Sequence, residues 1–139
     1  MKINFTKKQF ETLIELVYAG HWILNSHRNE EIEKYNEVEQ LIYSFAKPFG
    51  LEHFIEFDKK LDGYYPTLEF EDSMEELIAE YDDRAFWDEL VDRLALRDLT
   101  KEGIEGKSNE EIMERRIELE EKYEIEFEKH HLNRLKIEK

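Results

Sequence analysis

The sequence contains no cysteine, and glycine and proline are also scarce, with five and two copies among 139 residues. The first absence excludes disulfides, thiol catalysis and thiolate metal sites. The second leaves few breaks between segments, which favours long helices. No run of about eighteen apolar residues could span a bilayer, and the first residues lack the apolar stretch of a signal peptide. We therefore expect a soluble, cytoplasmic protein with no membrane association.

Positive charge is in short supply, with 20 lysines and arginines against 35 aspartates and glutamates, a net charge of −15. Eleven of these fifteen net charges fall between Pro48 and Leu99. A field of that sign repels nucleic-acid phosphates and anionic lipids, so we expect no direct nucleic-acid binding. It attracts basic proteins, which makes such a protein the expected partner.

Aliphatic residues and phenylalanine are plentiful enough for a folded core, and the length suits one domain. The helical spacing of these residues predicts a mainly α fold, a bundle of about five helices that begins with an αα-hairpin. We expect residues 1–139 to form a single domain, with a small β-hairpin or short strands around 54–67 and a further strand possible at 134–137.

The clearest local signal lies in residues 5–24. Thr6 and Gln9 match a capping box, and Phe5 and Phe10 match the hydrophobic staple that accompanies it. Apolar residues then cover most of the helix circumference, which predicts a helix at the centre of the core.

A second helix is predicted from about Glu30 to Lys47, with an apolar seam of Tyr35, Val38, Ile42, Phe45 and Phe49. Pro48 and Gly50 should end it, because proline cannot continue the helical hydrogen bonds and glycine suits the left-handed position after a helix.

Three further helices are expected after the hairpin. Ser73 with Glu76 forms a second capping box, Asp82 or Asp83 could cap a separate helix ending near Leu99, and Ser108 with Glu111 forms a third capping box. The last helix should run to about residue 128, with five residues facing inward: Ile112, Met113, Leu119, Tyr123 and Phe127.

Residues 69–92 hold the candidate functional surface, with eleven carboxylates against the single cation Arg84. We predict that carboxylates of this stretch contact a basic partner, as in an inhibitor, immunity or antitoxin-like protein, with Tyr81 or Trp87 adding affinity. The predicted partner-binding residues are Glu75, Glu76, Glu80, Asp82, Asp83, Asp88, Glu89 and Asp92. Mimicry of a nucleic acid by these carboxylates is a minor alternative.

A different class of function is a small-molecule site or small enzyme with a pocket lined by Tyr18, His21 and Trp22. His21 lies on the apolar seam of the first helix, where a histidine is more often a hydrogen-bonded core residue. The sequence has no glycine-rich phosphate loop, nucleophile elbow or His-Glu-x-x-His motif, and nothing in it argues for catalysis. No pattern assigns an oligomeric state.

No cofactor is predicted, although two patterns resemble metal sites. Asp58, Asp62, Gly63 and Glu69 match positions 1, 5, 6 and 12 of a calcium-binding EF-hand loop, but Lys60 occupies a ligand position. A hairpin turn explains the same residues. Glu128 and His131 form one Glu-x-x-His, whereas a dimetal bundle needs two.

Overall fold

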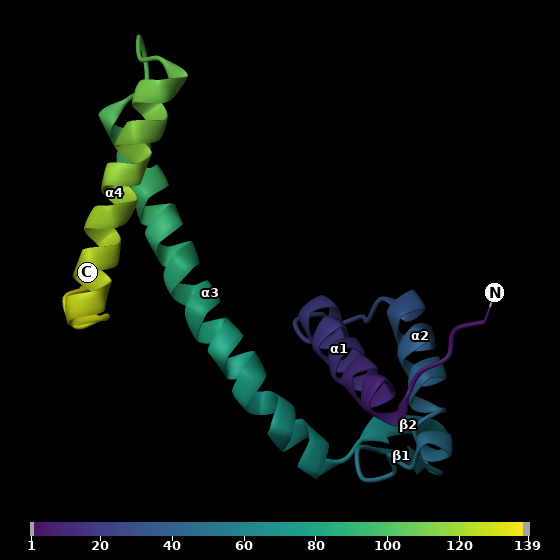
Figure 1. Ribbon diagram of the computed structural model, residues 1–139. Coiled ribbons are helices and arrows are strands. Elements are labelled where there is room, and N and C mark those ends of the chain that lie inside the picture. Colours follow the sequence, from purple (N-terminus) through teal and green to yellow (C-terminus); the bar gives the residue numbers. More distant parts are fainter. Residues whose placement is uncertain (1, 138–139) are drawn as a thin grey trace. The chain divides into compact units, whose positions relative to one another are not determined.

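The computed structural model describes residues 2–137 and is mainly helical, as predicted (Figure 1). Its elements are α1 (Lys7–Asn25), α2 (Glu33–Tyr43), the 3-10 turn η1 (Lys47–Phe49), β1 (Ile55–Asp58), β2 (Gly63–Pro66), α3 (Leu68–Glu102) and α4 (Asn109–His130). The described residues thus contain four α-helices rather than about five. They form two compact units, Met1–Ala79 and Glu80–Lys139, with the boundary inside α3. The assignment of one domain stays a prediction.

Helix α1 begins as the sequence predicts. The Thr6 hydroxyl accepts a hydrogen bond from the Gln9 backbone N–H at 3.2 Å, and the Gln9 side chain accepts one from the Thr6 N–H at 3.0 Å. Phe5 and Phe10 meet edge to face with ring centroids 6.2 Å apart, which is the predicted staple. Local sequence is sufficient here because every partner lies within five residues.

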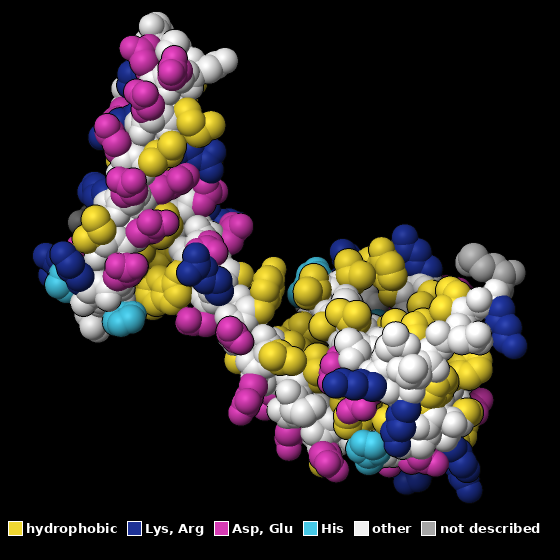
Figure 2. Space-filling view, viewed as in Figure 1, with side chains coloured by type: hydrophobic (Ala, Val, Ile, Leu, Met, Phe, Trp, Pro, Cys, Tyr) yellow, Lys and Arg dark blue, Asp and Glu magenta, His cyan; other side chains and the backbone are white. Residues whose placement is uncertain are grey.

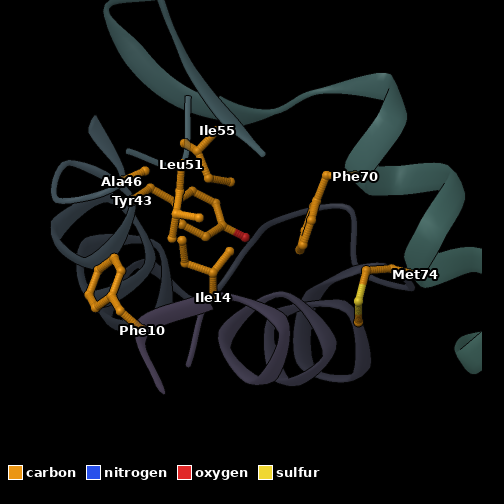
Figure 3. Packing of buried hydrophobic residues seen from close by; sticks show 8 residues of the cluster. All are labelled: Phe10, Ile14, Tyr43, Ala46, Leu51, Ile55, Phe70 and Met74. Atoms are coloured by element: carbon orange, nitrogen blue, oxygen red, sulfur yellow. The ribbon is translucent and has the colours of Figure 1, made fainter. Parts of the chain in front are cut away.

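The core of the first unit draws on every element between Phe10 and Met74. Figure 3 shows residues from α1, the end of α2, β1 and the start of α3 gathered around one interior. Its buried members are Phe10, Ile14, Tyr43, Ala46, Leu51, Ile55, Phe70 and Met74. Helix α1 contributes to this core but is not enclosed by it, since Leu16 is 65% exposed and Ile23 is 55% exposed.

Helix α2 is shorter than predicted and turns a different face inward. It spans Glu33–Tyr43, whereas the prediction ran from about residue 30 to 47. Val38 and Phe45 of the predicted seam are 53% and 46% exposed, while Tyr43 and Ala46 are buried. The seam is confirmed at Ile42 and Phe49, which pack against the core, and wrong at Val38 and Phe45, because polar side chains such as Asn36 and Glu39 face α1 instead. Pro48 and Gly50 do not end α2, which already ends at Tyr43. Pro48 lies in η1, and Gly50 takes the left-handed position after this turn, with φ of 68°.

Strands β1 and β2 form the predicted hairpin, paired antiparallel from Ile55 with Pro66 to Asp58 with Gly63. Four residues, 59–62, connect them, and Asp62 adopts the left-handed conformation with φ of 50°. Gln40 of α2 fixes the hairpin by accepting a hydrogen bond from the Tyr64 N–H and donating one to the Tyr64 carbonyl, both at 2.8 Å.

Helix α3 runs without interruption from Leu68 to Glu102, so the predicted helix starts at Ser73 and at Asp82 or Asp83 are wrong. The start lies one residue after Thr67, whose hydroxyl accepts a hydrogen bond from the Phe70 N–H at 3.3 Å. Ser73 instead donates to the Phe70 carbonyl at 2.6 Å within the helix. A capping pattern permits a helix start but does not break an existing helix, and no glycine or proline lies inside α3.

The second unit packs the C-terminal half of α3 against α4. Ala95, Leu99 and Leu119 form its small buried core, with Ile112 and Tyr123 packed against them. The third capping box is confirmed, because the Ser108 hydroxyl and the Glu111 side chain exchange hydrogen bonds with each other's backbone N–H. Met113, predicted to face inward, is 57% exposed, so that assignment was wrong.

The segment after α4 has no strand at the residues described up to 137, so the strand predicted at 134–137 is wrong. Turns follow His130 instead, held by backbone hydrogen bonds such as Asn133 N–H to the His130 carbonyl. Within residues 2–137, no helix combines the length and the apolar character that crossing a bilayer requires.

Candidate functional site

The eight predicted partner-binding carboxylates all lie on α3, but in two different units. Glu75 and Glu76 belong to the first unit, and the other six belong to the second. Seven are exposed and Asp92 is half-buried. These carboxylates are therefore at the surface, as predicted, but they are divided between the two units.

Three of the eight are already engaged in ion pairs. Asp88 accepts a hydrogen bond from Arg84 and Glu89 one from Arg93, each at 3.0 Å, and Asp92 pairs with Arg116 of α4. The first two pairs are exposed i,i+4 pairs, which contribute roughly 0.3–0.5 kcal/mol each to folding. Their charges remain accessible to a partner.

A hollow of about 360 Å³ lies between α3 and α4 within the second unit. Nine residues line it: Asp83, Arg84, Trp87, Asp88, Val91, Glu124, Phe127, Glu128 and His131. Figure 2 shows carboxylate side chains distributed along both helices of this unit. The hollow thus combines an apolar base with an acidic edge.

The base of the hollow is aromatic. Trp87 packs against Phe127 with ring centroids 5.5 Å apart and planes tilted by 42°, and against the His131 ring at 5.8 Å. Phe127 and Val91 also line the hollow and are buried. The Trp87 indole N–H donates to Asp83 Oδ1 at 3.3 Å, which fixes the orientation of the half-buried ring.

Four carboxylates surround this base, Asp83 and Asp88 from α3 and Glu124 and Glu128 from α4. Arg84 is the single lysine or arginine among the lining residues. An aromatic face and carboxylates within one hollow attract a cation through both the ring quadrupole and direct charge. The predicted partner-binding residues included Asp83 and Asp88 but not Glu124, Phe127 and His131. The available signal was the i,i+4 spacing of Glu124 with Glu128 and of Phe127 with His131.

A second cluster of functional groups lies between α1 and α2 in the first unit, around His21. Asn25, 2% exposed, accepts a hydrogen bond from the Ile32 N–H at 2.9 Å and donates to Asn36 Oδ1 at 3.1 Å. The Asn36 amide donates to Glu31 at 2.5 Å. Asn36 presents its oxygen to His21 Nε2 at 2.6 Å, and the Asn25 amide nitrogen lies 3.0 Å from the same ring nitrogen, so both amides contact Nε2.

The other ring nitrogen of His21 faces an acid. Nδ1 lies 3.5 Å from Glu39 Oε1, with the two side chains 20% and 14% exposed. A hydrogen bond between these two atoms needs a proton on either Nδ1 or the Glu39 carboxyl. Burial raises the pKa of Glu39, and the nearby His21 only partly offsets that rise. His21 is therefore a part-buried residue with polar contacts between α1 and α2.

Of the predicted pocket residues on α1, Tyr18 and Trp22 stack on each other, whereas His21 faces α2. The Tyr18 ring meets Phe70 edge to face at 5.3 Å and Trp22 at 6.5 Å, while His21 faces α2. Burial, followed by the charge of Glu71, raises the pKa of Tyr18. The Tyr43 hydroxyl is fully buried, and no residue between 2 and 137 forms a hydrogen bond with it. Burial, then the Glu39 charge, raises its pKa. Sequence reasoning missed Asn25, Asn36 and Glu39 because it followed apolar spacing alone.

The EF-hand-like residues form a turn. Asp58 Oδ1 accepts hydrogen bonds from the Lys60 N–H at 2.7 Å and the Leu61 N–H at 3.1 Å, and Asp62 takes the left-handed position. Glu69 lies in the first turn of α3. Across residues 2–137, no three histidine or carboxylate side chains are grouped as a metal ion would require.

No protein-family model matches the sequence, and neither a curated protein nor a solved structure is significantly similar to it. The function must therefore be argued from the two clusters themselves. In the cluster around His21 the polar side chains contact one another, whereas in the hollow most of the carboxylates remain exposed at the surface.

Proposed function

We propose that the protein is an acidic interaction module that binds a basic partner protein through its second unit. The observation that carries this proposal is the hollow of about 360 Å³, in which an aromatic base is surrounded by four carboxylates. Aromatic residues in a concave site supply affinity, while the charges steer the encounter and set specificity. This narrows the contact from the whole 69–92 stretch to the faces of α3 and α4 that line the hollow.

The remaining carboxylates of α3 serve the same function at longer range. Glu80 and Asp82 are exposed near the hollow in the sequence, and their field adds to that of its rim. Because exposed charges are screened beyond roughly 8 Å at physiological salt, binding should weaken as salt rises. A basic partner would therefore associate quickly at low salt and be held mainly by contacts in the hollow.

Affinity capture with three forms of the protein tests the proposal. The first is wild type, and the second carries Asp88→Asn, Glu124→Gln and Glu128→Gln in the hollow. The third carries Glu110→Gln, Glu114→Gln and Glu121→Gln, which are exposed on α4, do not line the hollow and change the net charge equally. Proteins enriched by wild type are identified, purified and titrated against each form at 50, 150 and 500 mM salt, a range that spans strong and weak screening.

We expect basic proteins to be retained by the wild type and the control form and to be lost from the hollow form. Their affinity should fall with rising salt. Enriched proteins that are not basic, or an equal loss from the hollow and control forms, would contradict the proposal.

A further inference from the structure

The hollow between α3 and α4 has a shape and a chemistry that discriminate among cations. Its base is a flat indole held in place by the bond from Trp87 to Asp83, and its rim carries carboxylates on both helices. A cation that enters therefore meets a planar aromatic face below and hydrogen-bond acceptors at the sides. We infer that the hollow binds the guanidinium group of an arginine side chain presented by a basic partner. This inference rests on the proposed function and names the group that the site recognises.

A planar guanidinium suits this arrangement better than an ammonium. It is more weakly hydrated, stacks on aromatic rings and carries five N–H donors in a rigid fork that matches carboxylates in pairs. A methylated ammonium would need a cage with more aromatic rings and would leave the carboxylates without hydrogen bonds. The two aromatic rings and four carboxylates present here favour the group that can both stack and donate.

Arg84 of the same chain already demonstrates one half of this recognition. Its side chain, 80% exposed, lies at the rim and donates from Nε to Asp88 at 3.0 Å. An incoming arginine must compete with Arg84 for this carboxylate. Removal of Arg84 should therefore strengthen binding, while removal of the Asp88 charge should weaken it.

The chain offers a matched control for both changes. Arg93 and Glu89 form an i,i+4 pair on the same helix, at the same distance of 3.0 Å and with similar exposure, but neither lines the hollow. Arg93→Gln changes the net charge as Arg84→Gln does, and Glu89→Gln changes it as Asp88→Asn does. The difference in affinity between a variant in the hollow and its control therefore excludes the effect of net charge.

The test is a titration of the isotope-labelled protein with three short peptides, followed through the indole N–H signals in ¹H–¹⁵N NMR spectra. The peptides are acetyl-Ala-Arg-Ala-amide, its neutral citrulline analogue and its lysine analogue. The two tryptophans give two indole signals, and Trp22→Phe identifies the signal of Trp87. Dispersed spectra of the variants, all changed at exposed side chains, show that they are folded.

We expect a saturable shift of the Trp87 indole signal with the arginine peptide, a weaker one with lysine and none with citrulline. Asp88→Asn should weaken binding about tenfold, as loss of a charge-assisted hydrogen bond does, and Arg84→Gln should tighten it about threefold. Glu89→Gln and Arg93→Gln should change it much less, by no more than a screened charge outside the hollow contributes.

Equal responses to arginine and lysine, an equal shift of the Trp22 signal, or equal effects of Asp88→Asn and Glu89→Gln would overturn the inference. These results are separate from the affinity capture. Salt-sensitive capture of basic proteins without an arginine-specific shift would leave the proposed function standing and remove the guanidinium assignment. Loss of both would remove the two together.

Discussion

The two units of the chain share an acid-rich composition but use their polar side chains in opposite ways. In the first unit, Asn25, Asn36, His21 and Glu39 turn inward and bond one another between α1 and α2. In the second, arginines and carboxylates pair on the surface around a small core of Ala95, Leu99 and Leu119. Buried networks specify one packing, while exposed pairs contribute little to stability and leave their charges available.

The pKa directions follow the same division. Burial raises the pKa of Glu39 in the first unit. In the second unit, the hydrogen bond from Tyr123 lowers the pKa of Asp98, that from Arg115 lowers the pKa of Glu102, and that from the Ser108 backbone N–H lowers the pKa of Glu111. Glu39 is thus held against ionisation, whereas Asp98, Glu102 and Glu111 are stabilised as anions.

The largest expected effect is the loss of stability when a buried apolar side chain of the first unit is truncated, compared with an exposed one. Ile14 is fully buried among the residues of Figure 3, so Ile14→Ala should lower the free energy of unfolding by about 2–5 kcal/mol. Leu16 lies on the same helix and is 65% exposed, so Leu16→Ala should lower the free energy of unfolding by less than about 0.5 kcal/mol. Urea denaturation followed by circular dichroism measures both, and similar costs would show that α1 is enclosed after all.

Loss of one amide from the buried network should cost more than loss of a surface ion pair. Asn25→Ala leaves the Ile32 N–H without its acceptor, so we expect a loss of about 1–3 kcal/mol. Arg115→Gln in the second unit breaks pairs with Glu102 and Glu118 but should cost under about 1 kcal/mol. Chemical denaturation of both variants compares them, and a larger cost for Arg115→Gln would reverse the contrast between the units.

The two capping boxes allow the same local change in each unit. Thr6→Ala and Ser108→Ala each remove the hydroxyl that accepts a hydrogen bond at 3.2 Å from the third helical residue. Each should cost about 1 kcal/mol in the free energy of unfolding. Thermal unfolding of both variants, with Ser26→Ala at the end of α1 as a control, gives the comparison. Unequal costs would mean that tertiary packing, not the cap, sets helix stability.

Acid should affect the units in opposite directions. Glu39 has a higher pKa in the folded than in the unfolded protein. It therefore stabilises the fold at a pH below its unfolded pKa, and this contribution is lost as the pH rises through its folded pKa. Asp98, Glu102 and Glu111 have lower pKa values in the folded protein. They therefore stabilise the fold at a pH above their unfolded pKa values, and this contribution is lost as the pH falls through their folded pKa values.

Urea denaturation between pH 3 and 7 measures this difference, with Trp22 and Trp87 as separate reporters in Trp87→Phe and Trp22→Phe proteins. Acidification should weaken the Trp87 transition more than the Trp22 transition. Glu39→Gln should reduce the pH dependence of the Trp22 transition alone. Identical pH profiles for the two reporters would contradict the assignment of these acids to separate environments.

The smallest expected effect is at Tyr43. Its hydroxyl is buried without a hydrogen-bond partner, so Tyr43→Phe removes an unsatisfied polar atom and keeps the ring in place. We expect a change within about 1 kcal/mol, neutral or stabilising. A large loss of stability in denaturant would instead show that the hydroxyl is bonded to ordered water or to Glu39.

Features specified by neighbouring residues were predictable from the sequence. The caps at Thr6 and Ser108, the left-handed Gly50 and the hairpin at 55–66 each depend on a few adjacent positions. The Ser73 pattern has the same form but lies inside α3, because whether a helix starts there depends on whether the preceding residues are already helical.

The candidate site was predicted in part, for a similar reason. The acidity of α3 and the presence of Trp87 are visible in the sequence, but the hollow needs Phe127 and Glu124 from a helix more than thirty residues away. The inward face of α2 was missed because its polar side chains are satisfied by α1, a pairing that no apolar pattern encodes.

The continuous helix α3 has a consequence for its own dynamics. Phe70 and Met74 are buried in one unit and Val91, Ala95 and Leu99 in the other, but between Glu75 and Arg84 every side chain except Ile78 is exposed. The backbone hydrogen bonds of this stretch are not covered by buried side chains, so they can open without disturbing either core. Amide hydrogen exchange should therefore be faster in the middle of this helix than on either side of it. The two units would then exchange as separate cooperative blocks, although one unbroken helix carries them both.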